Sequence, residues 1–136
     1  MPDKFRVGLI QMSATPDPDK NLQRAIDRLH QAQAKGAQIV CLPELFQTQY
    51  FCQREDTALF DLAEPIPGPT TARLAEAAKL LRIVLIGSLF EKRATGDHVV
   101  SSCWVSVERV QAIASLRQSS SPARPDGGAP AKPERR

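Results

Sequence analysis

The sequence contains few cysteines and few aromatic residues, and it has no long hydrophobic run. Its three cysteines lack the spacing of a metal site, which fits a reducing, cytoplasmic environment better than a disulfide scaffold. No segment approaches the roughly 20 apolar residues of a membrane span, and the N-terminus lacks the layout of a signal peptide, so we expect no membrane association. No phosphate-binding loop or metal-ligand constellation is present, so we expect no metal and no cofactor. Basic and acidic residues nearly balance (18 against 15), which argues against a specific nucleic-acid partner.

The remaining composition is that of one globular domain. A chain of 136 residues with 42% hydrophobic residues can bury a real core. Apolar periodicity and helix-start signals predict five elements. They are a strand over residues 5–12, a helix from Asp17 or Asp19 to Gly36, a strand over 38–42, a helix over 69–81 and a strand over 83–90. Strands that alternate with helices predict an α/β fold with right-handed crossovers.

Glu44 follows directly after the second predicted strand. A glutamate in this place is commonly solvated or paired with a nearby basic residue, but three features favour a catalytic base. Pro43 ends the hydrogen-bond ladder of the strand and fixes the backbone before the carboxylate. Residues 39–42 are apolar, so we expect Glu44 at the floor of a pocket, where exclusion of water makes a carboxylate a stronger base. The loop over 43–67 is long and leaves the carboxyl end of a strand, where α/β sheets usually bind ligands.

Four segments together resemble a known family. They are VGLIQMSATPDPDKNLQRAIDRL, GAQIVCLPELF, YFCQREDTALFDLAEPIPGPTT and GSLFEKR. In this order they resemble the nitrilase superfamily of carbon–nitrogen hydrolases and, within it, most closely the N-carbamoylputrescine amidases. The resemblance covers residues 4–96, about two thirds of the chain.

The resemblance implies a fold, a reaction and two site residues. The fold is a four-layer α-β-β-α sandwich that pairs with a second subunit, so a homo-oligomer is expected. The reaction is hydrolysis of a non-peptide carbon–nitrogen bond in a small carbamoyl or amide substrate, as in polyamine metabolism, by a Glu-Lys-Cys triad. Glu44 would be the general base that takes the proton of the cysteine thiol, and the lysine would stabilise the oxyanion. Tyr50 would line the substrate pocket.

The chain departs from the family pattern in its two other catalytic residues. The lysine of the family lies in an Arg-Lys-x-His motif and the nucleophile in an Ile-Cys-Trp-Asp motif, and the 136 residues contain neither. A base without a nucleophile and an oxyanion donor has nothing to activate. We therefore expect the chain as written to be inactive.

None of the three cysteines is a convincing substitute for the nucleophile. Cys41 belongs to the strand before Glu44 and is expected to be a buried, small hydrophobic residue. Cys52 is expected to line the pocket loop. Cys103 precedes Trp104, as the nucleophile does, but Val105 occupies the place of the acidic neighbour.

The candidate basic residues are equally poor. Lys92 lies between Glu91 and Arg93, which indicates a solvated charge cluster at a strand end and not an oxyanion site. His30 is expected at the surface of the first helix. His98 has no triad context.

The sequence pattern changes after residue 96. Residues 1–96 are interpreted as the N-terminal part of a carbon–nitrogen hydrolase domain and residues 97–114 as a divergent segment that supplies one strand or a short helix. Residues 115–136, rich in proline, serine and arginine, are predicted to be disordered. A frameshift, a retained intron or an alternative end would each explain the change.

Three functions remain open at this point. The first is the base-bearing part of a carbon–nitrogen hydrolase of the amidase type. The second is a non-catalytic subunit that pairs with a full-length homologue through an unfilled sheet edge after residue 90. The third is a non-functional fragment with an incomplete core and an uncovered sheet face.

Overall fold

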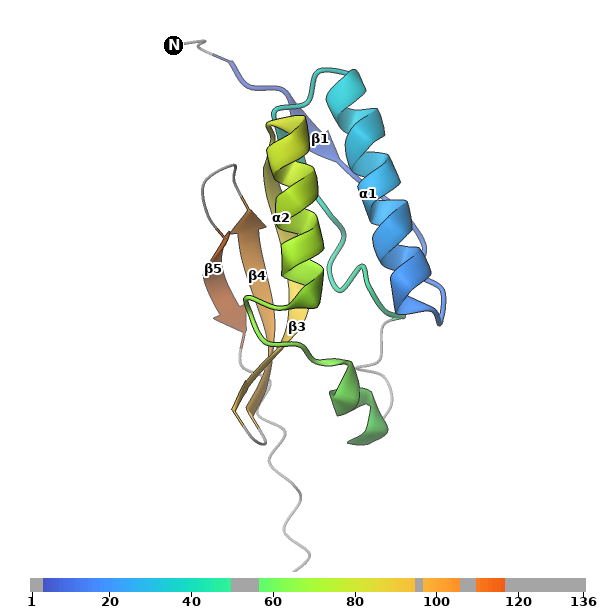
Figure 1. The fold of residues 1–136 in the computed structure, drawn as a ribbon, viewed down its shortest axis with the longest axis vertical. Coiled ribbons are helices and arrows are strands. Elements are labelled where there is room, and N and C mark those ends of the chain that lie inside the picture. Colours follow the sequence, from blue (N-terminus) through green and yellow to red (C-terminus); the bar gives the residue numbers. More distant parts are fainter. Residues whose placement is uncertain (1–3, 50–56, 95–96, 106–109, 117–136) are drawn as a thin grey trace, which may run out of the picture.

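The computed structural model describes residues 4–49, 57–94, 97–105 and 110–116 of the chain. Its elements are β1 (Val7–Leu9), α1 (Pro18–Ala34), β2 (Ile39–Cys41), the 3-10 helix η1 (Thr57–Leu62), α2 (Pro69–Leu81), β3 (Val84–Ala94), β4 (Asp97–Val105) and β5 (Val110–Leu116). The strands form one sheet in the order β1-β2-β3-β4-β5, and both α-helices cover the same face of it (Figure 1). The α/β prediction is therefore confirmed. None of the described helices has the length and apolar composition of a membrane span.

The sheet has a parallel half and an antiparallel half. β1, β2 and β3 are parallel, with Val7 opposite Ile39 and Ile39 opposite Val84. β3, β4 and β5 form an antiparallel meander. The edge of β3 is therefore paired with β4, and the prediction of an unfilled edge after residue 90 is wrong. Within the described sheet the open edge on the parallel side is that of β1.

The divergent segment contains two strands, where the sequence predicts a single strand or a short helix. β4 and β5 cover most of residues 97–116. Their formation depends on pairing with β3, and such tertiary pairing overrides weak local periodicity. β5 ends at Leu116, two residues inside the segment predicted to be disordered. Residues 117–136 lie outside the described residues.

The core lies between the sheet and the two helices. Its buried apolar side chains are Leu22, Ala25, Leu29, Ala37, Val40, Leu42, Phe46, Leu74, Ala77, Ala78, Ile83, Leu85 and Leu89. On β1 the alternate residues Val7 and Leu9 are 53% and 80% exposed. Successive side chains of a strand point to opposite faces of a sheet. The sheet face without helices is therefore uncovered at β1 in this chain.

The first helix begins at the predicted cap. Asp17 is the N-cap residue, and its Oδ1 accepts hydrogen bonds from the backbone N–H groups of Asp19 and Lys20, each at 3.1 Å. Pro18 occupies the first turn, where its missing N–H is not needed. Gly36 follows the helix with φ of 86°, a left-handed conformation that glycine adopts without strain.

Replacement of Asp17 by alanine is expected to lower the urea midpoint of unfolding, because two N–H groups lose their acceptor. The hydrogen bond from the Lys20 N–H, with smaller contributions from the Lys20 side chain, lowers the pKa of Asp17 below its ordinary value of 3.8. A carboxylate whose pKa is lower in the folded than in the unfolded state stabilises the protein at pH values above the unfolded-state pKa. This stabilisation is lost as the pH falls through the folded-state pKa. The midpoint difference between wild type and Asp17→Ala should therefore shrink below about pH 3.8. Asp19→Ala is the control, since that carboxylate accepts no cap bond among the described residues. An effect as large as that of Asp17→Ala would contradict the assignment.

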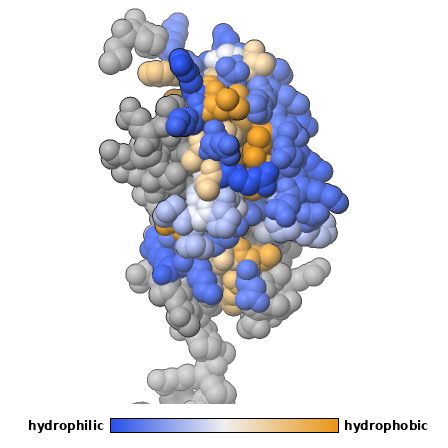
Figure 2. Space-filling model, viewed as in Figure 1, coloured by the Kyte–Doolittle hydropathy of each residue, from blue (hydrophilic) through white to orange (hydrophobic). Residues whose placement is uncertain are grey.

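The second helix has the predicted bounds. Gly68 is the N-cap residue and Pro69 begins the helix. Leu74, Ala77 and Ala78 face the core, whereas Leu80 is 73% exposed. Hydrophobic residues consequently come to the surface near the C-terminal end of α2, while the outer surface of α1 is mainly hydrophilic (Figure 2).

Candidate active site

The turn that carries Glu44 begins where β2 ends. The Leu42 N–H still donates to the Ile86 carbonyl of β3 at 2.9 Å. Pro43 has no N–H and ends the ladder, and residues 44–47 then form a turn. Leu45 has φ of 48°, in the left-handed region that costs a non-glycine residue roughly 1–2 kcal/mol. The position of Glu44 after a strand is thus as predicted, and the residue next to it is strained.

Glu44 is exposed, so its predicted place at the floor of a water-excluded pocket is wrong for this chain. Its neighbours are buried: Leu42 is 9%, Leu45 4% and Phe46 2% exposed. The apolar side chains around Glu44 enter the core beneath the helices, and the turn leaves the carboxylate outside it. Among the described residues no hydrogen bond or ion pair involves Glu44.

A polar network that the sequence patterns above do not predict holds the far side of the same turn. Gln47 Nε2 donates to Thr70 Oγ1 at 2.7 Å and to Glu64 Oε1 at 3.2 Å. Glu64 also accepts hydrogen bonds from the Thr70 N–H (2.9 Å) and the Thr70 hydroxyl (2.8 Å). The Gln47 carbonyl accepts a hydrogen bond from Asn21 Nδ2 at 2.9 Å. One signal could have indicated Glu64: Gly68 has no side chain to cap α2, so the first turn of that helix needs an outside acceptor.

The structure describes the place of two of the three candidate cysteines in the sheet. Cys41 is half-buried in β2, not fully buried as predicted. Cys103 lies in β4, opposite Gly87 of β3. Tyr50 and Cys52 lie outside the described residues, so the roles predicted for them in the substrate pocket stay predictions.

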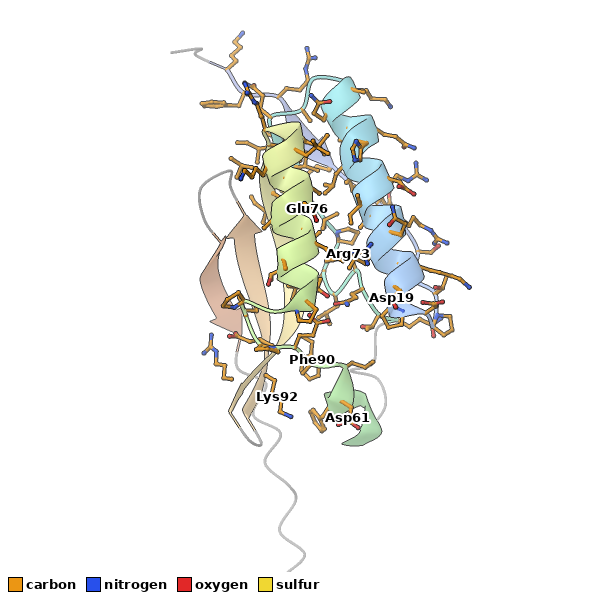
Figure 3. All side chains as sticks on the ribbon, viewed as in Figure 1. Asp19, Asp61, Arg73, Glu76, Phe90 and Lys92 are labelled. Atoms are coloured by element: carbon orange, nitrogen blue, oxygen red, sulfur yellow. The ribbon has the colours of Figure 1, made fainter. Side chains whose placement is uncertain are left out.

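Among the described residues, no hydrogen bond or ion pair joins Lys92 or His30 to Glu44. Lys92 is exposed on the lower part of β3 (Figure 3), and its N–H donates to the Glu64 carbonyl at 2.9 Å. Glu91 and Arg93 do not form the predicted solvated cluster, because Glu91 is only 8% exposed. Its Oε2 forms an ion pair with Arg93 Nε at 3.0 Å. His30 is exposed on α1, as expected. His98 lies opposite Lys92 in the register of β4 with β3.

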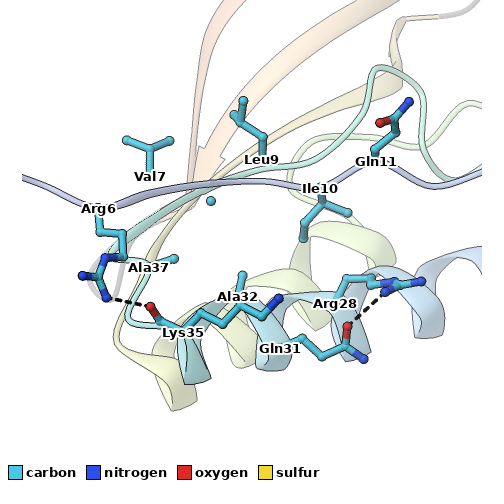
Figure 4. A pocket seen from close by; sticks show the side chains of 11 residues that line it. Arg6, Val7, Leu9, Ile10, Gln11, Arg28, Gln31, Ala32, Lys35 and Ala37 are labelled. Carbon is cyan, nitrogen blue, oxygen red and sulfur yellow. Dashed lines mark hydrogen bonds between the residues drawn. The ribbon is translucent and has the colours of Figure 1, made fainter.

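A cavity of about 310 Å³ lies at a different place, along β1 and the C-terminal half of α1 (Figure 4). Arg6, Arg28 and Lys35 contribute to its lining. Two of these cations already donate to neutral acceptors, Arg6 to the Lys35 carbonyl at 2.8 Å and Arg28 to Gln31 at 3.0 Å. Glu44 does not line this cavity. In the ranges that the structure describes, no group of three His, Cys, Asp or Glu side chains could hold a metal ion.

The family model for carbon-nitrogen hydrolases matches residues 6–125, which is most of the chain. The chain belongs to the carbon–nitrogen hydrolase family. The match continues past residue 96, where the resemblance of the four sequence segments ends, and includes β4 and β5. The change of pattern after residue 96 therefore does not mark the end of the family's sheet.

Relatives of known activity match the chain in part. An omega-amidase of Xenopus tropicalis is 42% identical over 94 residues, which are 68% of this chain and 32% of that protein. An N-carbamoylputrescine amidase of Oryza sativa is 38% identical over 90 residues, 65% of this chain and 30% of that protein. The chain thus spans about a third of the length of these carbon–nitrogen hydrolases. It resembles both kinds of amidase to a similar degree.

Solved carbon–nitrogen hydrolases show the same fold. That of Helicobacter pylori G27 superposes with a TM-score of 0.73 at 31% identity, over 79% of this chain and 39% of that protein. A variant of the amidase from Nesterenkonia sp. AN1, in complex with butyramide, has a TM-score of 0.62 at 26% identity over 83% of this chain and 42% of that protein. These likenesses confirm the nitrilase-like α/β fold.

Proposed function

We propose that the chain carries the general base of an amidase that hydrolyses a non-peptide carbon–nitrogen bond, with Glu44 as that base. One observation supports this more than any other: in a carbon–nitrogen hydrolase chain, a carboxylate at the carboxyl end of β2 is exposed while Leu42, Leu45 and Phe46 around it are buried. A side chain placed in this way is free to meet a nucleophile and a substrate. The strained backbone at Leu45 also favours a functional role, because strain of this kind persists where the surrounding structure enforces it.

The chemistry of the proposed base is a proton transfer. Glu44 would accept the proton of a cysteine thiol, so that the thiolate attacks the amide or carbamoyl carbon. The protonated Glu44 would then give this proton to the nitrogen, which leaves as ammonia. Water then cleaves the thioester and restores the thiol. The lysine that stabilises the oxyanion and the cysteine itself belong to the two motifs that the 136 residues do not contain.

The proposed substrates are small aliphatic molecules that end in a CO–NH₂ group. The names of the relatives supply two candidates, an omega-amide and N-carbamoylputrescine, the second of which would place the protein in polyamine metabolism. N-Carbamoylputrescine carries an amine that is cationic at neutral pH. The two are distinguished by comparing ammonia release from each at equal concentration, in a protein that also carries the lysine and the cysteine.

The chain alone is expected to release no ammonia from either substrate above the rate of the uncatalysed reaction. The reason is that a base has nothing to activate without a nucleophile and an oxyanion donor. The measurement is a coupled ammonia assay on the purified 136-residue chain, with a full-length relative as positive control. Turnover that Glu44→Gln abolishes would overturn the expected inactivity while it supports Glu44 as the base.

A second proposed function is that of a non-catalytic subunit that pairs with a homologue. The exposed Val7 and Leu9 on the uncovered sheet face favour it, because contiguous exposed apolar surface commonly marks an interface. Sedimentation velocity of the chain, alone and with a full-length amidase, tests this directly. A heavier species that contains both proteins would support it, a species of two identical chains would indicate a homo-oligomer, and two unchanged boundaries would exclude both.

A further inference from the structure

Three separate elements converge on Gln47, which lies three residues after Glu44. Its carbonyl is bound by Asn21 at the start of α1, and its side chain is bound to Thr70 at the start of α2. Its third partner, Glu64, is itself fixed to β3, since the Glu64 N–H donates to the Phe90 carbonyl at 3.0 Å. The end of the turn is thereby connected to both helices and to the sheet.

Two of the partners in this network are buried, whereas Gln47 and Glu64 are half-buried. Asn21 is 0% and Thr70 1% exposed. Every side-chain hydrogen-bonding group of Asn21 is used, because its Oδ1 accepts hydrogen bonds from the Thr15 N–H and hydroxyl and its Nδ2 donates to the carbonyls of Thr15 and Gln47. Buried polar groups without partners are costly, so the network strongly favours one arrangement of the turn.

The turn needs such support because its own backbone is strained. Leu45 adopts a left-handed conformation that leucine seldom takes. Burial of Leu45 and Phe46 fixes how deep the turn sits, but apolar contacts are not directional. Hydrogen bonds are directional, and Gln47 makes those that join this turn to Asn21, Glu64 and Thr70.

We infer that Gln47 is a positioning residue, which through Glu64 and Thr70 fixes the turn that presents Glu44. The inference rests on the proposed role of Glu44 and states how the chain holds that residue in place. Gln47 itself does not touch the reacting atoms. Its contribution is the orientation of the backbone from which the carboxylate projects.

The test is the backbone order of the turn in the full 136-residue chain, measured by 15N relaxation. In the wild type we expect order parameters of about 0.85 for the amides of Glu44 and Leu45. In Gln47→Leu, which removes the donors but keeps the bulk, they should fall below about 0.6, and hydrogen exchange of the Thr48 amide should rise about tenfold. The matched control is Gln23→Leu, which removes a glutamine that bonds Asp27 and Arg73 on the exposed face of α1. It should leave the turn unchanged.

A reciprocal exchange separates positioning from general loss of structure. In the double variant Gln47→Glu with Glu64→Gln, the amide and the carboxylate change places and can still bond to each other and to Thr70. The double variant should recover the wild-type order parameters of the turn. Gln47→Glu alone places a second carboxylate next to Glu64 and should not recover them. If Gln47→Leu does not fold, the isosteric Glu64→Gln still weakens the network and should loosen the same amides.

Unchanged order at Glu44 and Leu45 in both Gln47→Leu and Glu64→Gln would overturn the inference, as would failure of the double variant to recover it. The measurement does not depend on turnover. If Glu44 proves dispensable for catalysis, the proposed function fails while the order of the turn still reports on Gln47. The two failures are therefore distinguishable.

Discussion

Replacing Glu44 with glutamine is expected to lower kcat about 10²–10⁴-fold once the missing catalytic partners are supplied. A suitable protein is a chimera in which the stretch of this chain that is 38% identical to the rice N-carbamoylputrescine amidase over 90 residues replaces the matching part of that enzyme. Glutamine has nearly the same shape as glutamate but cannot take a proton from a thiol. The loss should therefore appear in kcat, with little change in KM.

The matched control for this substitution is Glu76→Gln in the same chimera. Glu76 is an exposed carboxylate on α2 (Figure 3), without a hydrogen bond or ion pair in the described part of the chain. Its replacement should change kcat less than about twofold, because surface substitutions away from special features have small effects. Turnover that survives Glu44→Gln would falsify the assignment of the base, provided that the unsubstituted chimera is active.

Replacing Leu74 with alanine is expected to lower the free energy of unfolding of the chain by about 2–5 kcal/mol. Leu74 is 0% exposed and belongs to the core between the helices and the sheet. The substitution loses the favourable free energy of transferring the leucine side chain from water into the core. It also leaves a cavity that a packed core only partly closes. The measurement is the urea midpoint at constant m-value, which reports a change of stability and not of compactness.

Leu80→Ala on the same helix is the control. Leu80 is 73% exposed, so its truncation removes little buried surface and should change the free energy of unfolding by less than about 0.5 kcal/mol. Equal effects of the two substitutions would mean that α2 is not packed as described. An absent cooperative transition in the wild type would instead favour the third possibility, a fragment that does not fold by itself.

The elements that the sequence predicts well are those with strong local signals. The helix over 69–81 has its predicted bounds because Gly68 and Pro69 define its start and an apolar face continues to its end. The strand predicted over 5–12 is observed only as Val7–Leu9, since β1 has a single neighbour to pair with in the described sheet. β4 and β5 have little periodicity of their own. They form because β3 offers a long edge with which an adjoining segment can pair.

The candidate site likewise has some features that local sequence signals predict and others that they do not. The place of Glu44 at the end of a strand follows from a local pattern, an apolar run that ends in proline. The exposure of the Glu44 side chain does not follow from a local pattern, because burial depends on which surfaces the fold brings together. Gln47 could not be found by spacing, since Glu64 and Thr70 follow it by 17 and 23 residues, and no repeat connects an amide to such partners.

The order of the strands in the described sheet has a consequence for synthesis. Each strand from β1 to β5 lies beside the one that follows it in the chain. A polypeptide leaves the ribosome from its N-terminus, and folding can begin before synthesis ends. Every new strand of this sheet therefore emerges next to a neighbour that is already present. No strand has to be inserted between two earlier ones, and the sheet can grow from one side at the pace of translation.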